Sequence, residues 1–149
     1  MDSEKKINDF DFDRAELIRR AVNQLGSAYA PYSKFHVAAA VLMESGNIYT
    51  GVNVENASFP AGICAERNAI SHAVACGEQR IKAIAIVGGK HGRRTHFCAP
   101  CGICRQVMRE FSHPSEMKIL LAVSEDDFRE TTLEELLPDS FGPEDLIRD

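Results

Sequence analysis

The amino-acid sequence predicts an α/β fold, a three-layer α/β/α sandwich around a mixed β-sheet. Segments with helical periodicity alternate with short apolar segments typical of buried strands, in the order αββαβαβα. The chain has 149 residues, of which 44% are hydrophobic, so it is long enough for one domain with a substantial core. We expect a single domain over residues 1–149, with a flexible N-terminal extension over residues 1–12.

The first third of the chain predicts a helix followed by a β-hairpin. Apolar residues recur at helical spacing over residues 17–28, and Asp13 is placed to cap the start of this helix. Residues 37–43 and 48–53 are apolar enough to be strands. The Ser-Gly-Asn segment at residues 45–47 is typical of the turn that joins two such strands.

The rest of the chain predicts two further strands and three helices. A helix over residues 64–76 ends at Gly77, since glycine adopts the left-handed conformation that terminates helices. Cys76 lies on the apolar stripe of this helix, so we expect it in the core. In residues 81–87, large apolar residues alternate with small ones, which predicts a buried strand. The acidic segment 124–130 predicts no element. The remaining elements are a helix at residues 102–111, a strand at 118–123 and a short helix that begins at 133–137 and ends at Pro138.

The charge and hydropathy of the chain argue against two classes of partner. The formal net charge is −5, which repels a phosphate backbone, so we expect no nucleic-acid partner. The basic run at residues 90–94 is interpreted as a solvated loop. The longest apolar run, residues 37–43, is too short to span a bilayer, and the charged N-terminus does not resemble a signal peptide. We therefore expect a cytoplasmic protein without a membrane partner, whose five cysteines stay reduced.

Three cysteines lie where two helices are predicted to begin. Cys101 and Cys104 are three residues apart, so one helix face presents both sulfurs. Cys64 lies at the start of the other helix, and the partial positive charge of helix N-termini favours the thiolate that binds metal. Placed side by side, the two helix ends would offer three thiolates to one cation. Three soft ligands with an open fourth position are typical of a catalytic zinc site that binds water.

Other residues near this motif leave alternative interpretations open. Cys98 forms a second C-x-x-C pattern with Cys101, but it precedes the helix and is interpreted as a small packed residue. His96 is a candidate fourth ligand of a closed, structural zinc site. A redox-active dithiol is a further alternative, although no thioredoxin-like segment precedes the motif.

A glutamate accompanies the first cysteine. Taken alone, Glu66 is an acidic residue in the first helical turn, where the helix dipole favours it. Followed later by Pro-Cys-x-x-Cys, however, Cys-x-Glu is the signature of zinc deaminases, in which the glutamate moves a proton from zinc-bound water to the base. Three thiolates make bound water less acidic than three histidines do, so the site requires a general base.

Two arginines directly follow candidate zinc-site residues. Arg67 follows Glu66, and Arg105 follows Cys104. Either arginine could offset the negative charge of three thiolates by hydrogen bonding to a ligating sulfur. The alternative for each is an ordinary surface ion pair.

Five segments together are far more specific than the zinc motif alone. They are APYSKF at residues 30–35, NVENA at 53–57, GICAER at 62–67, PCGICRQ at 100–106, and ELLP through phenylalanine at 135–141. Over residues 15–146 the chain resembles the homotetrameric, zinc-dependent cytidine deaminases of pyrimidine salvage. The resemblance implies a fold of that type, with one Zn²⁺ per subunit. It also implies hydrolytic deamination of free cytidine and deoxycytidine to uridine and deoxyuridine, by zinc-activated water with a glutamate proton shuttle.

The resemblance implies a role for individual residues. Cys64, Cys101 and Cys104 match the zinc ligands of the family, and Glu66 matches its proton shuttle. Five positions match substrate contacts: Phe35 packs on the pyrimidine ring, Asn53 and Glu55 hydrogen-bond the ribose hydroxyl, the Ala65 backbone contacts the base edge, and Phe141 reaches into a neighbouring subunit's site. Without the resemblance, Phe35 is interpreted as a core residue and the Asn53–Glu55 pair as a polar strand exit.

The chain departs from the family pattern in its pocket. Phe59 stands where the resemblance leads us to expect tyrosine, so any hydroxyl contact there is lost. Three alternative functions remain: a deaminase of a nucleoside antibiotic, a polynucleotide deaminase and a non-catalytic zinc module. The segment around Phe141 favours the free nucleoside, the acidic chain offers no obvious cationic groove for a strand, and a closed zinc site would leave Glu66 without a task.

Overall fold

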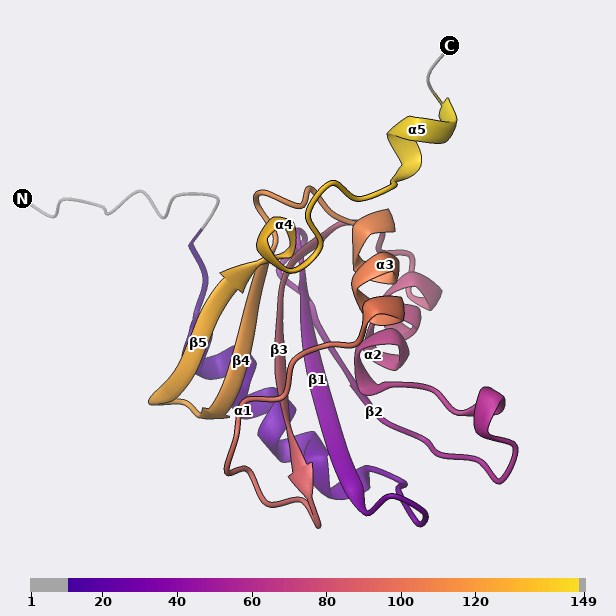
Figure 1. The fold of residues 1–149 in the computed structure, drawn as a ribbon. Coiled ribbons are helices and arrows are strands. Elements are labelled where there is room, and N and C mark those ends of the chain that lie inside the picture. Colours follow the sequence, from indigo (N-terminus) through magenta and orange to yellow (C-terminus); the bar gives the residue numbers. More distant parts are fainter. Residues whose placement is uncertain (1–10, 148–149) are drawn as a thin grey trace, which may run out of the picture.

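The computed structural model describes residues 11–147 and contains a five-stranded mixed sheet (Figure 1). The strand order is β2-β1-β3-β4-β5, in which β3 and β4 are parallel and the other neighbouring pairs are antiparallel. The strands are β1 (Phe35–Met43), β2 (Ile48–Val52), β3 (Ile81–Lys90), β4 (Lys118–Ser124) and β5 (Asp127–Thr132). Most of the expected N-terminal extension, residues 1–10, lies outside the described residues, whereas Phe12 packs against the core.

Helices cover both faces of this sheet, as predicted (Figure 1). The helices are α1 (Arg14–Gln24), α2 (Ala65–Ala75), α3 (Gly102–Glu110), α4 (Leu133–Leu136) and α5 (Pro143–Ile147), with single 3₁₀ turns at Leu25–Ser27 and Phe59–Ala61. Successive residues of a strand point to opposite faces, so the strand β1 contributes to two cores. Ala38, Ala40 and Leu42 pack with α1, whereas Ala39, Val41 and Met43 pack with α2 and α3.

Local sequence signals explain the start of α1 and the first hairpin. The Asp13 carboxylate accepts a hydrogen bond from the Glu16 N–H at 3.0 Å, which satisfies one of the free donors of the helix end. The helix ends at Gln24, earlier than the apolar periodicity predicts, and continues as a 3₁₀ turn. The hairpin between β1 and β2 turns at Gly46, whose positive φ of 95° favours glycine.

The prediction for Cys76 is wrong, although its helix forms as expected. Gly77 follows the end of α2 with a φ of 93°, as the terminating glycine does in other helices. Ala73 is fully buried, but Cys76 is exposed. The apolar stripe of α2 therefore continues beyond the part of the helix that the sheet covers.

The sequence prediction missed the edge strand β5 and the terminal helix α5. The strand β5 pairs antiparallel with β4, and only one of its six residues is buried, so no apolar run marks it. Thr131 is its buried residue, and Phe128 packs against the core under α1. The helix α5 contains no buried residue and projects away from the sheet in Figure 1.

The sheet topology brings the beginnings of α2 and α3 to one region. Because β3 and β4 are parallel, the chain must cross over between them, and α3 makes this crossing on the face that α2 also covers. Gly51 lets α2 lie close to β2, since a Cβ atom at this position would come within 2.3 Å of the Ala69 nitrogen. Within residues 11–147, no helix combines the length and apolar character needed to span a bilayer.

Candidate active site

Three cysteine sulfurs meet where α2 and α3 begin. Cys64 is the N-cap residue of α2, Cys101 is the N-cap residue of α3, and Cys104 lies in the first turn of α3. The Sγ atoms of Cys64 and Cys101 are 3.9 Å apart, and those of Cys101 and Cys104 are 3.4 Å apart. All three sulfurs lie within 4.8 Å of one another. In the part of the chain that the structure describes, no other group of three or more potential ligand side chains converges in this way.

This arrangement fits a zinc ion. Tetrahedral zinc with Zn–S bonds of about 2.3 Å places its sulfur ligands about 3.8 Å apart, which is close to both measured separations. Both N-cap cysteines have extended backbone and use no side-chain atom to cap their helix, so their sulfurs are available to a metal. Cys104 is buried and Cys101 is exposed, so the cluster lies between the core and the surface.

The thiols of this cluster differ in acidity. Hydrogen bonding from the Cys104 thiol, and then from the Arg67 guanidinium, lowers the pKa of Cys64 to about 5. The same contact with Cys64, together with burial, raises the pKa of Cys104. Of Cys64 and Cys104, Cys64 is therefore the thiol that ionises first, and a second thiolate beside it requires a cation to offset its charge.

Cys98 and His96 lie outside the sulfur cluster. Cys98 is half-buried and packs against the core, and burial raises its pKa to about 11. The ring of His96 contacts the Thr95 hydroxyl at 2.9 Å through its Nδ1 atom. Neither residue belongs to the group whose ligand atoms converge. The geometry thus favours three protein ligands over the closed four-ligand site.

Glu66 lies in the first turn of α2, directly after the Cys64 and Ala65 positions. Its residue surface is only 4% exposed, and this burial raises the pKa of its carboxyl group. Hydrogen bonding with the Cys104 thiol opposes that shift, so the carboxyl group lies beside the sulfur cluster. A buried carboxyl group with a raised pKa next to a metal centre is suited to accept and return protons.

The two arginines make different contacts. Arg67 donates from Nη2 to the Cys64 sulfur at 3.7 Å, and its buried Nε has no hydrogen-bond partner among the described residues. Arg105 instead donates to two carbonyl oxygens, that of Pro100 at 2.8 Å and that of Leu136 at 2.7 Å. Arg105 therefore ties the segment before Cys101 to α4, whereas Arg67 places its charge at a sulfur.

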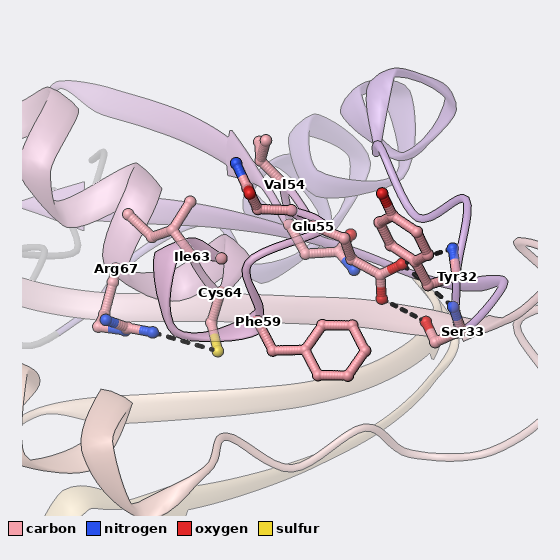
Figure 2. Close-up of a pocket in the computed structure, with 11 residues that line it drawn as sticks. Tyr32, Ser33, Val54, Glu55, Phe59, Ile63, Cys64 and Arg67 are labelled. Atoms are coloured by element: carbon pink, nitrogen blue, oxygen red, sulfur yellow. Dashed lines mark hydrogen bonds between the residues drawn. The ribbon is translucent and has the colours of Figure 1, made fainter.

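A hollow of about 600 Å³ lies beside Cys64 and Arg67 (Figure 2). Asn53, Glu55 and Phe59 also line this hollow. The Asn53 side-chain amide is hydrogen-bonded to the first residues of β1. Its Nδ2 donates to the Phe35 carbonyl at 2.8 Å, and its Oδ1 accepts from the Val37 N–H at 2.9 Å. The structure thus brings both predicted ribose-binding residues to the lining of a cavity that Cys64 also lines.

Two of the predicted substrate contacts lie elsewhere. Phe35 begins β1, is 42% exposed rather than buried in the core, and lines a neighbouring hollow of about 430 Å³. Phe141 lies on the segment before α5, is 59% exposed, and lines neither of these hollows of its own chain. Its carbonyl accepts a hydrogen bond from the Gln106 side chain on α3 at 2.9 Å, which anchors this segment.

Sequence reasoning missed the turn that holds Glu55. The carboxylate oxygen Oε1 accepts from the Tyr32 N–H at 3.0 Å and from the Ser33 N–H at 3.1 Å, and Oε2 accepts from the Ser33 hydroxyl at 2.5 Å. These hydrogen bonds, with that from the Ser33 side chain first, lower the pKa of Glu55. The sequence signal was only a Pro-Tyr-Ser turn, and its partner lies more than twenty residues away in the chain.

Comparison with known proteins points to one family. The family described as "Cytidine and deoxycytidylate deaminase zinc-binding region" matches residues 13–120. The cytidine deaminase of Halalkalibacterium halodurans is 42% identical over 134 residues, covering 90% of this chain and 98% of the relative. That of Sporosarcina psychrophila is 43% identical over 134 residues, covering 90% of this chain and 95% of the relative.

Solved structures agree with this result. The crystal structure of cytidine deaminase from Burkholderia pseudomallei superposes with a TM-score of 0.76 at 42% identity, covering 85% of this chain and 97% of that one. The Mycobacterium tuberculosis cytidine deaminase gives 0.76 at 39% identity, covering 89% of this chain and 99% of that one. Together the fold and the three-cysteine centre define a zinc-dependent hydrolase on an α/β/α sandwich, with one zinc ion per subunit. The chain belongs to the cytidine and deoxycytidylate deaminase family.

Proposed function

We propose that this enzyme hydrolyses free cytidine and deoxycytidine to uridine and deoxyuridine, with release of ammonia, in cytoplasmic pyrimidine salvage. The observation that carries the proposal is a buried carboxyl group, Glu66, beside three converging cysteine sulfurs, one of which, that of Cys64, lines a hollow of about 600 Å³. The names of relatives with over 40% identity across nine tenths of the chain support the substrate. When bound, zinc acts as a Lewis acid that lowers the pKa of a coordinated water.

Glu66 moves the protons of this reaction. Its carboxylate accepts a proton from the attacking water and delivers it to the ring nitrogen N3, so that C4 becomes electrophilic. The water oxygen bonds to C4, and its remaining proton passes through Glu66 to the 4-amino group, so that the C4–N bond breaks and ammonia leaves. The raised pKa that burial gives Glu66 suits both directions of transfer, since a group that is too acidic would hold no proton to return.

Other residues bind and orient the nucleoside. Asn53 and Glu55 supply the amide and carboxylate that hydrogen-bond the ribose, and their place in the lining of the hollow supports this role. Phe35 offers an exposed ring at the start of β1 for packing on the pyrimidine. The Ala65 backbone, in the first turn of α2 between Cys64 and Glu66, is suited to contact the base edge.

The assembly we propose is a homotetramer, without a nucleic-acid or membrane partner. Apolar side chains stay exposed near the pocket, on the segment before α5 and on α5 itself, as expected for surfaces that another subunit covers. They include Tyr29, Tyr32, Phe59, Phe141, Leu146 and Ile147. The net charge of −5 supports the absence of a nucleic-acid strand from the pocket.

One assay tests the activity. Cytidine added to the purified, zinc-loaded protein is expected to be consumed, with an ultraviolet change that marks loss of the 4-amino group, and zinc measured on the same sample should approach one ion per chain. Intact, zinc-loaded protein that leaves cytidine and deoxycytidine unchanged would overturn the proposal. A single-stranded oligonucleotide that contains cytosine serves as the comparison substrate and should not be deaminated.

Arg67→Gln is expected to impair zinc retention or turnover by about 10–100-fold without unfolding the protein, because it removes the cation that contacts the Cys64 sulfur. Zinc content, kcat and melting temperature should be measured together. Arg20→Gln is the matched control, since Arg20 is a helical arginine whose ion pair with Glu16 is long, at 3.9 Å. Wild-type zinc content and kinetics in Arg67→Gln would show that Arg67 makes no functional contact.

Phe141→Ala is expected to weaken cytidine binding, the tetramer or both, because a buried aromatic ring at an interface is worth about 2 kcal/mol or more on truncation. The ring is 59% exposed in the isolated chain, so its removal should cost little stability within the subunit. Light scattering and KM measure the two effects. A native protein that is an active monomer in light scattering would contradict the shared-site arrangement.

A further inference from the structure

We propose that Ser33 is a positioning residue that holds the Glu55 carboxylate in the geometry that binds the nucleoside. The proposal rests on the ribose-binding role proposed for Glu55. Ser33 acts on the nucleoside through the Glu55 side chain and does not touch the reacting atoms.

The Ser33 hydroxyl connects two parts of the pocket. It donates to the Glu55 Oε2 atom at 2.5 Å and accepts from the Phe35 N–H at 3.0 Å. The Phe35 carbonyl is held in turn by the Asn53 amide at 2.8 Å. One hydroxyl therefore fixes the direction of a carboxylate and one end of the residue whose ring would pack on the pyrimidine (Figure 2 shows the Glu55 contacts).

The two oxygens of Glu55 are held unequally. Oε1 accepts from two backbone N–H groups, those of Tyr32 and Ser33, which no side-chain substitution removes. Within residues 11–147, the Ser33 hydroxyl is the one hydrogen-bond donor to Oε2. A carboxylate oxygen accepts more than one hydrogen bond, so Oε2 keeps room for a ribose hydroxyl while Ser33 sets its orientation.

The turn that carries Ser33 is rigid enough to act as a support. The N–H of Lys34 donates to the Ala30 carbonyl at 3.0 Å, and the Lys34 carbonyl accepts from the His91 N–H at 2.6 Å. The Glu55 N–H donates to the Tyr29 carbonyl at 2.9 Å, so the backbone of the carboxylate is tied to the segment leading into the same turn. Losing the Ser33 hydroxyl should therefore release the Oε2 side of the carboxylate without moving its backbone.

The nucleosides proposed as substrates restrict which hydroxyl Oε2 receives. Cytidine and 2′-deoxycytidine share only the 3′ and 5′ hydroxyls, so a contact used for both must involve one of these two. The binding of a nucleoside that lacks this hydroxyl cannot depend on the orientation of Glu55. 3′-Deoxycytidine and 5′-deoxycytidine are therefore the two probes that separate positioning of Glu55 from general damage to the pocket.

The experiment measures kcat and KM for cytidine and for both probes in wild type and Ser33→Ala. We expect Ser33→Ala to raise KM for cytidine about tenfold, as for loss of a hydrogen bond to a charged group, with a smaller change in kcat. For the deoxy probe that lacks the hydroxyl bound by Glu55, the KM of Ser33→Ala should stay near the KM of the wild-type enzyme for the same probe. In a Glu55→Gln background, Ser33→Ala should have little further effect.

Matched variants control for folding. Ser33→Thr keeps the hydroxyl and should stay near wild type. Ser33→Val has the shape of threonine without the hydroxyl and should match Ser33→Ala. Ser45→Ala removes an equivalent hydroxyl elsewhere, since Ser45 donates to Glu78 at 2.7 Å and accepts from the Asn47 N–H at 3.2 Å. Its KM should not change, whatever its melting temperature.

Two outcomes would overturn the proposals separately. An active wild type in which Ser33→Ala behaves like Ser45→Ala, or raises KM equally for cytidine and both deoxy probes, refutes the positioning role of Ser33 alone. A zinc-loaded wild type that is inert on cytidine refutes the proposed function itself and the positioning role that depends on it.

Discussion

Glu66→Gln is expected to bind zinc and cytidine but to turn over almost nothing. Glutamine keeps the shape of the side chain and one acceptor, so the first turn of α2 should survive. It cannot accept a proton from water at neutral pH, nor pass one proton to N3 of the ring and a second proton to the departing amine. One positioned acid–base group is worth about 10²–10⁴-fold, and Glu66 would serve several steps, so kcat should fall to the upper end of that range or beyond.

The alternative interpretation of Glu66 predicts a different pattern. A carboxylate that only complements the helix dipole contributes about 0.3–1 kcal/mol to stability and nothing to turnover. Glu16→Gln is the matched control, because Glu16 is the acidic residue in the first turn of α1. Zinc content, kcat and melting temperature should be measured on each preparation. One positioned acid–base group is worth about 10²–10⁴-fold, so a fully zinc-loaded Glu66→Gln protein with kcat within about tenfold of wild type would show that Glu66 is not the proton shuttle.

Cys101→Ala is expected to lose most of the bound zinc and, with it, the activity. The Cys101 sulfur lies 3.9 Å from that of Cys64 and 3.4 Å from that of Cys104, and its removal leaves only two of the three ligands. Metal analysis of the purified variant measures the loss. Since a metal that binds only the folded chain adds to its stability, the melting temperature should fall as well.

Cys98→Ser is the matched control for that loss. Cys98 is three residues before Cys101 but packs against the core and lies outside the converging group. We expect Cys98→Ser to keep both zinc and activity. If Cys98→Ser emptied the site while Cys104→Ala did not, the ligand set proposed for this protein would be wrong.

Much of the fold follows from signals between neighbours in the chain. Apolar spacing and the Asp13 cap predict α1, and the glycine after α2 predicts its end, because caps and periodicity depend on residues within a few positions. The edge strand β5 was missed for the same reason. Only one of its six residues is buried and five of the six are charged or polar, so only pairing with β4 makes them a strand.

The candidate site divides in the same way between local and tertiary information. The C-x-x-C spacing and the Cys-x-Glu motif are local, so the residue types of a zinc deaminase were recognisable from the sequence alone, and the longer segments identified the family. Local patterns do not determine whether the sulfurs of Cys64 and Cys101 lie close together in space. The two residues are separated by 37 positions and come together only because α2 and α3 pack on the same face of the sheet.

The sequence by itself determined the family, the metal and the order of most elements of this protein, because each is encoded in short patterns of residue type and spacing. Only the tertiary structure decided that Cys76 is exposed, that Arg67 rather than Arg105 contacts a sulfur, and that Ser33 holds Glu55. These outcomes depend on which surfaces the sheet covers and on which loops meet at its edge. Contacts of that kind join residues far apart in the chain, and no local pattern specifies them.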